Sequence, residues 1–359
     1  MIVVIADDIT GAAEMAGVAF DYGLKVRLVL GLDEGLPNAD VVVVATNTRS
    51  MSASQAAVVT KEVMSRLFMH GAESVPRLEL FKKTDSALRG HIMEELEAIL
   101  ACGPYRKAVF LPANPSRGRV IRDGKYYCGD VPISKTDFAF DPEFPAHTDS
   151  MRVRFPDAER LGVSMPDASS ADDLATVVAG CPPDTLLAGA ADLFEAMLVS
   201  RGHSRRATHS TMALDMDDAL VVAGSTQSQP CQLGLPVEMM PREVYDGEAD
   251  ATKWIHEVLP VYLRSPRMVL AIPFRHLTGK EVAVRLRQTM ADVVRAMVEA
   301  HPPSTLVLEG GATAYCCLEP LSWRQFAIAQ VYAPGVIRMV TPQSVSIILK
   351  PGSYPWPVV

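Results

Sequence analysis

Two neighbouring aspartates near the N-terminus have the type and spacing to do chemistry. Asp7 and Asp8 follow an apolar, strand-like run at residues 2–6 and stand just before a helix-like stretch. Because ligands of open parallel sheets bind beyond the carboxyl ends of the strands, both carboxylates are well placed. Their repulsion tends to raise the pKa of one of them, which favours a general base or a cation site. The alternative is that one aspartate simply caps the helix.

A second polar run, residues 82–91 (KKTDSALRGH), places three cations, one anion and two hydroxyls in a turn after another strand. Arginine binds carboxylate or phosphate through two parallel bonds, lysine acts as a point charge, and helix amides add a partial positive charge. This density indicates an anion site, with a solvated charged loop as the alternative. Arg49, in a polar run at residues 46–50, could reach the same crevice.

Two glycine-containing turns stand in the second half of the chain. Gly224 and Ser225 follow one strand-like run, whereas Gly310 and Gly311 follow another and open a helix. Glycines let backbone amides approach phosphate oxygens closely, although a tight turn without a ligand is equally natural for either loop alone. The sequence contains no P-loop pattern and no protein-kinase motif set. Glycine turns alone therefore leave ATP as one candidate anion among several.

Strands and helices alternate along the first part of the chain. Strands are predicted at residues 2–6, 40–45, 77–81 and 107–111, and helices at residues 55–68 and 91–100. This alternation predicts a mostly parallel sheet with helices on both faces.

Residues 112–150 interrupt that rhythm. Prolines and a glycine indicate a loop. Asp123-Gly124 stands between the β-branched pair Val120-Ile121 and the aromatic pair Tyr126-Tyr127, which predicts a hairpin inserted into the sheet. A flap is one interpretation of this segment.

A second α/β pattern follows the polar, basic residues 201–212, which we interpret as a surface linker. Strands are predicted at residues 219–223, 268–272 and 305–308, with a long helix at residues 280–300. The sequence thus predicts two α/β domains, each a mostly parallel sheet flanked by helices, with the inserted hairpin in the first. The first domain would span residues 1–205 and the second residues 206–359.

Composition limits the classes of partner. The chain has 359 residues, a formal net charge of -8 and no apolar stretch near the ~20 residues that span a bilayer. We therefore expect a cytoplasmic protein. A net negative field repels nucleic acid and anionic lipid, so we expect neither as a partner. The six cysteines form no C-x-x-C pair and have no zinc spacing, so no metal site is predicted from them. A homodimer is compatible with the sequence.

Taken in order, these segments resemble the four-carbon acid sugar kinase family over nearly the whole chain. The resemblance is carried by IADDITGAAEMAG, KKTDSALRGH, LPANPSRGR, VVAGSTQSQ, EGGATA and LKPGS. Members of that family phosphorylate the terminal hydroxyl of tetronates such as threonate, erythronate or 3-oxo-tetronate. Their N-terminal domain binds the sugar acid and their C-terminal domain binds ATP, so the resemblance implies an ATP-dependent small-molecule kinase.

The resemblance also implies site residues. Besides Asp8, the substrate-binding set would be Arg49, Lys83, Asp85, Ser86 and Arg89. The ATP-binding set would be Ser225, Gly310, Gly311, Ala312, Thr313 and Gly352. Two features depart from the family pattern: Ala312 stands where an acidic residue is usual, and a Ser-Tyr-Pro sequence follows Gly352 in place of a glycine-rich run.

A phosphoryl-transfer mechanism follows from that resemblance. Arg49 and Arg89 would grip the substrate carboxylate, Asp8 would accept the proton of the attacking hydroxyl, and Asp7 would orient Asp8 or contact sugar hydroxyls. The glycine turn would hold the ATP phosphates, with Mg²⁺ offsetting charge. A non-catalytic sugar-acid sensor is the alternative that the Ala312 departure keeps open. A dehydrogenase is disfavoured because no G-x-G-x-x-G motif follows a predicted strand.

Overall fold

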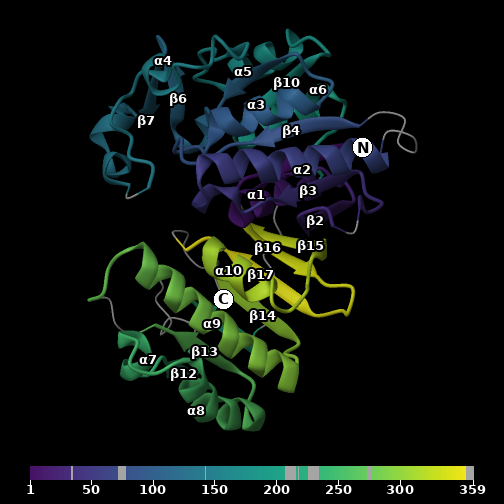
Figure 1. Ribbon diagram of the computed structural model, residues 1–359. Coiled ribbons are helices and arrows are strands. Elements are labelled where there is room, and N and C mark those ends of the chain that lie inside the picture. Colours follow the sequence, from purple (N-terminus) through teal and green to yellow (C-terminus); the bar gives the residue numbers. More distant parts are fainter. Residues whose placement is uncertain are drawn as a thin grey trace. The chain divides into compact units, whose positions relative to one another are not determined.

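The chain forms two compact units, Met1–Ala207 and Thr208–Val359. The computed structural model describes residues 1–33, 35–71, 78–141, 143–206, 216, 218–224, 234–272 and 276–352. Both units are α/β, with a sheet and packed helices in each (Figure 1). The predicted fold class is therefore confirmed.

The first unit contains a sheet of parallel strands. Their spatial order is β2 (Val26–Leu30), β3 (Val41–Ala45), β1 (Ile2–Ala6), β4 (Glu79–Lys83), β10 (Thr185–Gly189), β5 (Lys107–Leu111) and β9 (Val163–Ser164). Strand β1 is buried along its whole length, as expected where helices cover both faces of a sheet. Ala6 pairs with Ala45 on one side and with Lys83 on the other. The carboxyl ends of three adjacent strands are thus level, and the residues after them meet at one edge.

Helices pack in two groups in this unit. Helix α1 (Ile9–Asp21) packs on α6 (Ala191–Ser200), which also contacts α5 (Ala171–Ala179). Helix α2 (Ala53–Gly71) packs on α3 (Ile92–Cys102). Right-handed crossovers from this strand order put the two groups on opposite faces of the sheet.

The interruption after β5 folds as a small separate sheet. It contains β6 (Arg119–Arg122), β7 (Lys125–Cys128) and β8 (Val131–Pro132), all antiparallel, and it stands with the short helix α4 (Met151–Arg154) at one side of the first unit (Figure 1). Asp123 and Gly124 at the β6–β7 turn have φ angles of 50° and 69°. Positive φ at both central residues is the geometry that two-residue hairpins favour. The predicted hairpin is present.

The second unit has a mixed sheet. The parallel strands are, in order, β12 (Val237–Met239), β13 (Met268–Ala271), β11 (Ala219–Ala223), β14 (Thr305–Glu309) and β17 (Ser346–Lys350). The antiparallel strands β16 (Val336–Val340) and β15 (Gln325–Ala333) extend the sheet next to β17. Buried aliphatic residues of β11, β13, β14 and β17, including Val221, Val269, Val307 and Ile348, form a core cluster.

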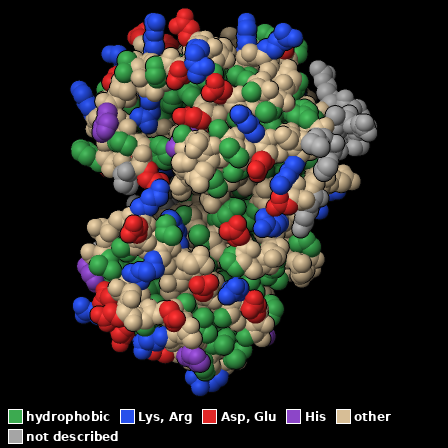
Figure 2. All heavy atoms as spheres, in the orientation of Figure 1, with side chains coloured by type: hydrophobic (Ala, Val, Ile, Leu, Met, Phe, Trp, Pro, Cys, Tyr) green, Lys and Arg blue, Asp and Glu red, His purple; other side chains and the backbone are tan. Residues whose placement is uncertain are grey.

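Helices of the second unit lie alongside one another (Figure 1). The long helix α9 (Lys280–Ala300) packs between α8 (Ala251–Arg264) and α10 (Gly311–Leu318), and the short α7 (Arg242–Asp246) contacts α8. Among the described helices, none has both the length and the apolar character needed to cross a bilayer. Acidic and basic side chains are intermixed on the face of both units that Figure 2 shows.

Candidate functional site

The edge where β1 and β3 end carries a network of carboxylates joined by one arginine. Asp7 follows β1, and its two oxygens accept from Arg49 Nε at 2.7 Å and from Nη2 at 3.0 Å. The same Nη2 donates to Asp8 Oδ1 at 2.8 Å. Asp8 is also the N-cap of α1, because its Oδ1 accepts from the Gly11 amide at 2.9 Å. The capping interpretation of Asp8 is therefore correct, and the same side chain also lies in the charged network.

Arg49 reaches this network because of the turn after β3. Thr48–Ser50 forms a single 3₁₀ turn, entered through Asn47 at a φ of 55°. The Arg49 amide donates to the Asp7 carbonyl at 3.2 Å, which fixes this turn beside the end of β1. Sequence reasoning placed Arg49 near the same crevice, and the structure brings it there.

Asp85 joins the network from the loop after β4. Its carboxylate accepts from Arg89 Nε and Nη2 at 2.9 Å each and from the Ala87 amide at 2.9 Å. Asp85 Oδ1 also lies 3.5 Å from Arg49 Nη2. Three aspartates and two arginines, all from the predicted site, thus form one connected ion-pair cluster.

The electrostatics of this cluster differ from the prediction of a raised aspartate pKa. Burial alone would raise the pKa of Asp7, but Arg49 and Lys82 together hold it below its ordinary value. For Asp85, burial is likewise outweighed by Arg49 and Arg89, so its pKa lies far below the usual range. An arginine between carboxylates removes the repulsion that the sequence suggested. Asp7 and Asp85 are therefore ionised at neutral pH.

Lys82 and Lys83 were predicted to lie in a turn, but they are the last two residues of β4 and are buried. Successive side chains of a strand point to opposite faces. Lys82 Nζ accordingly lies 2.8 Å from Glu95 Oε2 on α3. The two groups form an ion pair, but their orientation does not suit a hydrogen bond. Lys83 lies 3.1 Å from Glu14 Oε2 on α1, and against the effect of burial this carboxylate raises its pKa. Lys83 thus lies next to the aspartate–arginine cluster, whereas Lys82 pairs with Glu95 of helix α3.

Sequence reasoning missed three charged residues at this edge. Glu14 on α1 pairs with Lys83, and Arg117 Nε lies 3.9 Å from Glu14 Oε1. Arg119 at the start of β6 donates to the Ser86 hydroxyl. The signal was present in the quoted run LPANPSRGR, where two arginines flank a glycine, but no role was given to them.

Five of the six predicted nucleotide-binding residues line one pocket of about 650 Å³ in the second unit. These residues are Gly310, Gly311, Ala312, Thr313 and Gly352. Ser225, the sixth, lies outside the described residues. Gly310 has a φ of 93° and precedes the first residue of α10, so the free amides of the α10 N-terminus open at this pocket.

Gly224, which precedes Ser225, serves packing at the same place. A Cβ added to Gly224 would lie 2.3 Å from Thr313 Oγ1, far inside normal contact. Only glycine lets the end of β11 approach α10 this closely.

The pocket wall combines an apolar surface with one arginine. Leu277, Val282, Ala283 and Leu286 supply apolar side chains, and Arg287 also lines the pocket. In the described part of the chain, Arg287 makes neither a hydrogen bond nor an ion pair. Sequence reasoning missed Arg287, whose only signal was a position on the predicted long helix. An apolar wall suits the flat base of a nucleotide, and a cation with free helix amides suits its anionic phosphates.

No carboxylate occurs among the described residues that line this pocket. Magnesium is usually held by one or two carboxylates together with substrate phosphates. The described residues also contain no cluster of three or more acidic, histidine or cysteine side chains suited to a metal. The described lining therefore suits a nucleotide, and none of its residues is a carboxylate that could hold Mg²⁺.

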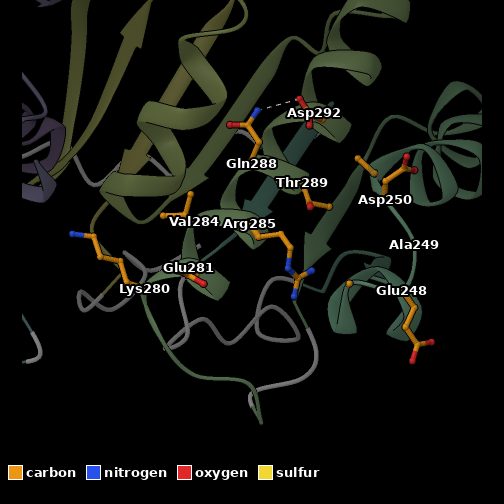
Figure 3. Close-up of a pocket in the computed structure, with 12 residues that line it drawn as sticks. Glu248, Ala249, Asp250, Lys280, Glu281, Val284, Arg285, Gln288, Thr289 and Asp292 are labelled. Atoms are coloured by element: carbon orange, nitrogen blue, oxygen red, sulfur yellow. Dashed lines mark hydrogen bonds between the residues drawn. The ribbon is translucent and has the colours of Figure 1, made fainter.

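A larger cavity of about 890 Å³ lies elsewhere in the second unit, between the turn after α7 and the first half of α9 (Figure 3). Its charged groups include Glu248, Asp250 and Lys280. Arg285, which also lines it, donates to the Val244 and Tyr245 carbonyls at 2.9 and 2.6 Å, so its guanidinium holds the end of α7. By size alone, this cavity would be the better candidate for a nucleotide site. The glycine turn and the α10 N-terminus, which can bind phosphate, line the smaller pocket, so we take the smaller pocket as the candidate nucleotide site.

Comparisons with known proteins bear on both units. Residues 2–155 match the family model described as the sugar-binding N-terminal domain. A D-threonate kinase of Bordetella bronchiseptica is 36% identical over 149 residues, which cover 40% of this chain and 36% of that enzyme. A 3-oxo-tetronate kinase of Cupriavidus necator is 25% identical over an alignment of 416 residues, which covers 98% of this chain and 94% of that enzyme.

A solved structure of a Haemophilus influenzae protein has the same fold, with a TM-score of 0.71 at 20% identity over 99% of this chain and 97% of that one. The chain spans about a third of the length of the four kinases that match it at 32–36% identity. These four are named D-threonate, 3-oxo-tetronate and D-erythronate kinases. The chain is therefore similar to tetronate kinases, and its residues 2–155 match the model of a sugar-binding N-terminal domain.

Proposed function

We propose that the chain is an ATP-dependent kinase that phosphorylates the terminal hydroxyl of a four-carbon sugar acid. The observation that carries the proposal is the cluster of Asp7, Asp8, Arg49, Asp85 and Arg89 at the carboxyl edge of the sugar-binding domain. The similarity to threonate, erythronate and 3-oxo-tetronate kinases supplies the substrate class.

Asp8 is the best placed proton acceptor of the three aspartates. Asp7 is held by two bonds from Arg49, and Asp85 by two bonds from Arg89. Asp8 Oδ2, in contrast, contacts only the Thr10 hydroxyl among the described residues, and the Asp8 side chain is 15% exposed against 3% for Asp7. A substrate hydroxyl can reach this oxygen and donate its proton as it attacks. Asp7 then acts as a positioning residue, because it fixes the arginine that contacts Asp8.

The second substrate, ATP, would occupy the pocket beside the Gly310–Gly311 turn. Its base would lie against the apolar wall of α9, and its phosphates would face the α10 amides and Arg287. Mg²⁺ would arrive with the nucleotide and screen phosphate charge, and none of the described residues that line the pocket is a carboxylate that would hold it. Catalysis by the protein would then consist of alignment, charge neutralisation and proton acceptance.

Coupled measurement of ADP release tests the proposal with threonate, erythronate and 3-oxo-tetronate as acceptors. We expect turnover with at least one of them, and phosphate on the terminal carbon of the product. A neutral C4 polyol serves as the control acceptor. Binding of these acids without any ADP release would refute the kinase and favour the non-catalytic sensor.

A further inference from the structure

Arg119 is a cation that the small inserted sheet brings to the aspartate cluster. It begins β6, and the loop before it is closed by two backbone bonds, from the Asn114 amide to the Arg119 carbonyl at 2.7 Å and from the Arg119 amide to the Asn114 carbonyl at 3.1 Å. Its guanidinium donates to the hydroxyl of Ser86, the residue that follows Asp85. The adjacent strand reinforces this placement, because the Tyr126 hydroxyl donates to the Ser86 carbonyl at 2.6 Å.

Arg119 differs from Arg49, Arg89 and Lys83 in what it contacts. Arg49 is bonded to Asp7 and Asp8, Arg89 is bonded to Asp85, and Lys83 is paired with Glu14. In the described part of the chain, the Arg119 guanidinium contacts only neutral groups, namely the Ser86 hydroxyl and the Phe138 ring at 5.2 Å. No carboxylate of the described residues therefore pairs with its positive charge.

Arg49 and Arg89 are poor receptors for a substrate carboxylate by the same reasoning. Asp7 is buried, and releasing Arg49 to a ligand would remove both hydrogen bonds that the guanidinium donates to its carboxylate. Arg89 holds Asp85 through the Nε–Nη2 edge of its guanidinium, and its Nη1 lies 4.0 Å from Asp141 Oδ2. A ligand carboxylate meets no such competition at Arg119, whose guanidinium, among the described residues, would share a hydrogen bond only with a neutral hydroxyl.

We propose that Arg119, and not Arg49 or Arg89, receives the carboxylate of the sugar acid and thereby sets the preference for acids over neutral polyols. This inference rests on the proposed function, since it names the anion-recognising residue of the same site. The inserted sheet then has a purpose: it carries the acid-recognising group to a cluster whose own arginines are already neutralised.

Two variants on the same strand test the inference. Arg119→Met removes the charge and keeps much of the side-chain length. Arg122→Met is the matched control, because Arg122 also lies over an aromatic ring, that of Tyr127 at 4.8 Å, but bonds to the exposed Gly129–Asp130 turn. Calorimetric titration of the full chain with threonate and erythronate, and with erythritol as the neutral probe, measures binding without turnover. Thermal melts confirm that both variants fold.

We expect Arg119→Met to weaken binding of the acid by about 10- to 100-fold, as loss of a charge-assisted bond predicts, with erythritol binding unchanged. Arg119→Lys should recover part of the loss, and Arg122→Met should bind like the wild type. If Arg119→Met folds and keeps wild-type affinity for the acid, or loses acid and erythritol affinity equally, the inference is wrong while the kinase proposal stands. If the wild type neither binds nor phosphorylates any four-carbon acid, the proposed function fails first.

Discussion

Replacing Arg49 by methionine should destabilise the first unit strongly at neutral pH. The guanidinium contacts Asp7 at 2.7 and 3.0 Å, Asp8 at 2.8 Å and Asp85 at 3.5 Å, and the Asp7 side chain is only 3% exposed. Removing one partner of a buried ion pair costs about 3–5 kcal/mol, because the remaining charge is uncompensated. For a unit of this size each kcal/mol lowers the melting temperature by about 2–4 °C, so a loss of about 6–20 °C is expected.

The effect of Arg49→Met should depend on pH, in a direction set by the lowered pKa values of two aspartates. The pKa values of Asp7 and Asp85 are depressed in the fold, so their stabilisation is present above the unfolded-state pKa of about 4 and is lost as pH falls through the folded values. Without Arg49, burial should raise the pKa of Asp7, and acid then protonates it at little cost. The difference in unfolding free energy between wild type and Arg49→Met should therefore shrink from pH 7 to pH 4.

Urea unfolding at both pH values measures this difference. Arg66→Met is the control, because Arg66 pairs with Asp33 on the surface, where such pairs contribute about 0–1 kcal/mol. Asp7→Asn in the Arg49→Met background should recover part of the stability, since it removes the orphaned charge. A loss below about 1 kcal/mol at pH 7, or one that grows toward pH 4, would contradict the reasoning.

Two further predictions concern the second unit. Arg287→Met should raise KM for ATP about tenfold or more with KM for the acid unchanged, since it removes the described cation of the pocket wall; an unchanged ATP dependence in steady-state kinetics would exclude Arg287 from phosphate binding. Gly224→Ala should lower the free energy of unfolding by about 1–3 kcal/mol, because the new Cβ would lie 2.3 Å from Thr313 Oγ1. Recovery in Gly224→Ala/Thr313→Ala, measured by urea unfolding, would tie the loss to that contact, and its absence would refute the cause.

Much of the fold was predictable because its signals are local. Apolar runs such as residues 2–6 became buried parallel strands, and Asp123-Gly124 formed the predicted hairpin turn. The antiparallel pair β15–β16 was not predicted, although it is a local hairpin in which Ala333 pairs with Val336 across two residues. The roles assigned to the two units, the cytoplasmic location and the homodimer stay predictions.

The residues of the candidate site could be predicted from the sequence, but the pairing of their charges could not. Asp7, Asp8, Arg49, Asp85 and Arg89 do meet, because strand ends in a parallel sheet share an edge. Which charges neutralise one another depends on contacts between segments far apart in sequence, and no local pattern reports these. That is why Asp7 has a lowered pKa where a raised pKa was expected for one aspartate of the pair.

Arg119 and the buried lysines were missed for related reasons. The end of β4 lies two residues beyond its predicted limit, which turns Lys82 and Lys83 from loop residues into side chains on opposite faces of the sheet. Arg119 belongs to a segment that sequence reasoning treated as an excursion, and only its folded position beside Ser86 links it to the site.

The kinetics of Asp8→Asn test the central claim most directly. Asparagine also caps helices well, so the bond to the Gly11 amide can persist while the proton acceptor is lost. With a four-carbon sugar acid and ATP, we expect kcat to fall about 10²–10⁴-fold while affinity for ATP and the melting temperature stay near wild type. Turnover close to that of the wild type would show that Asp8 is not the base and that the carboxylate cluster does not perform the chemistry proposed for it.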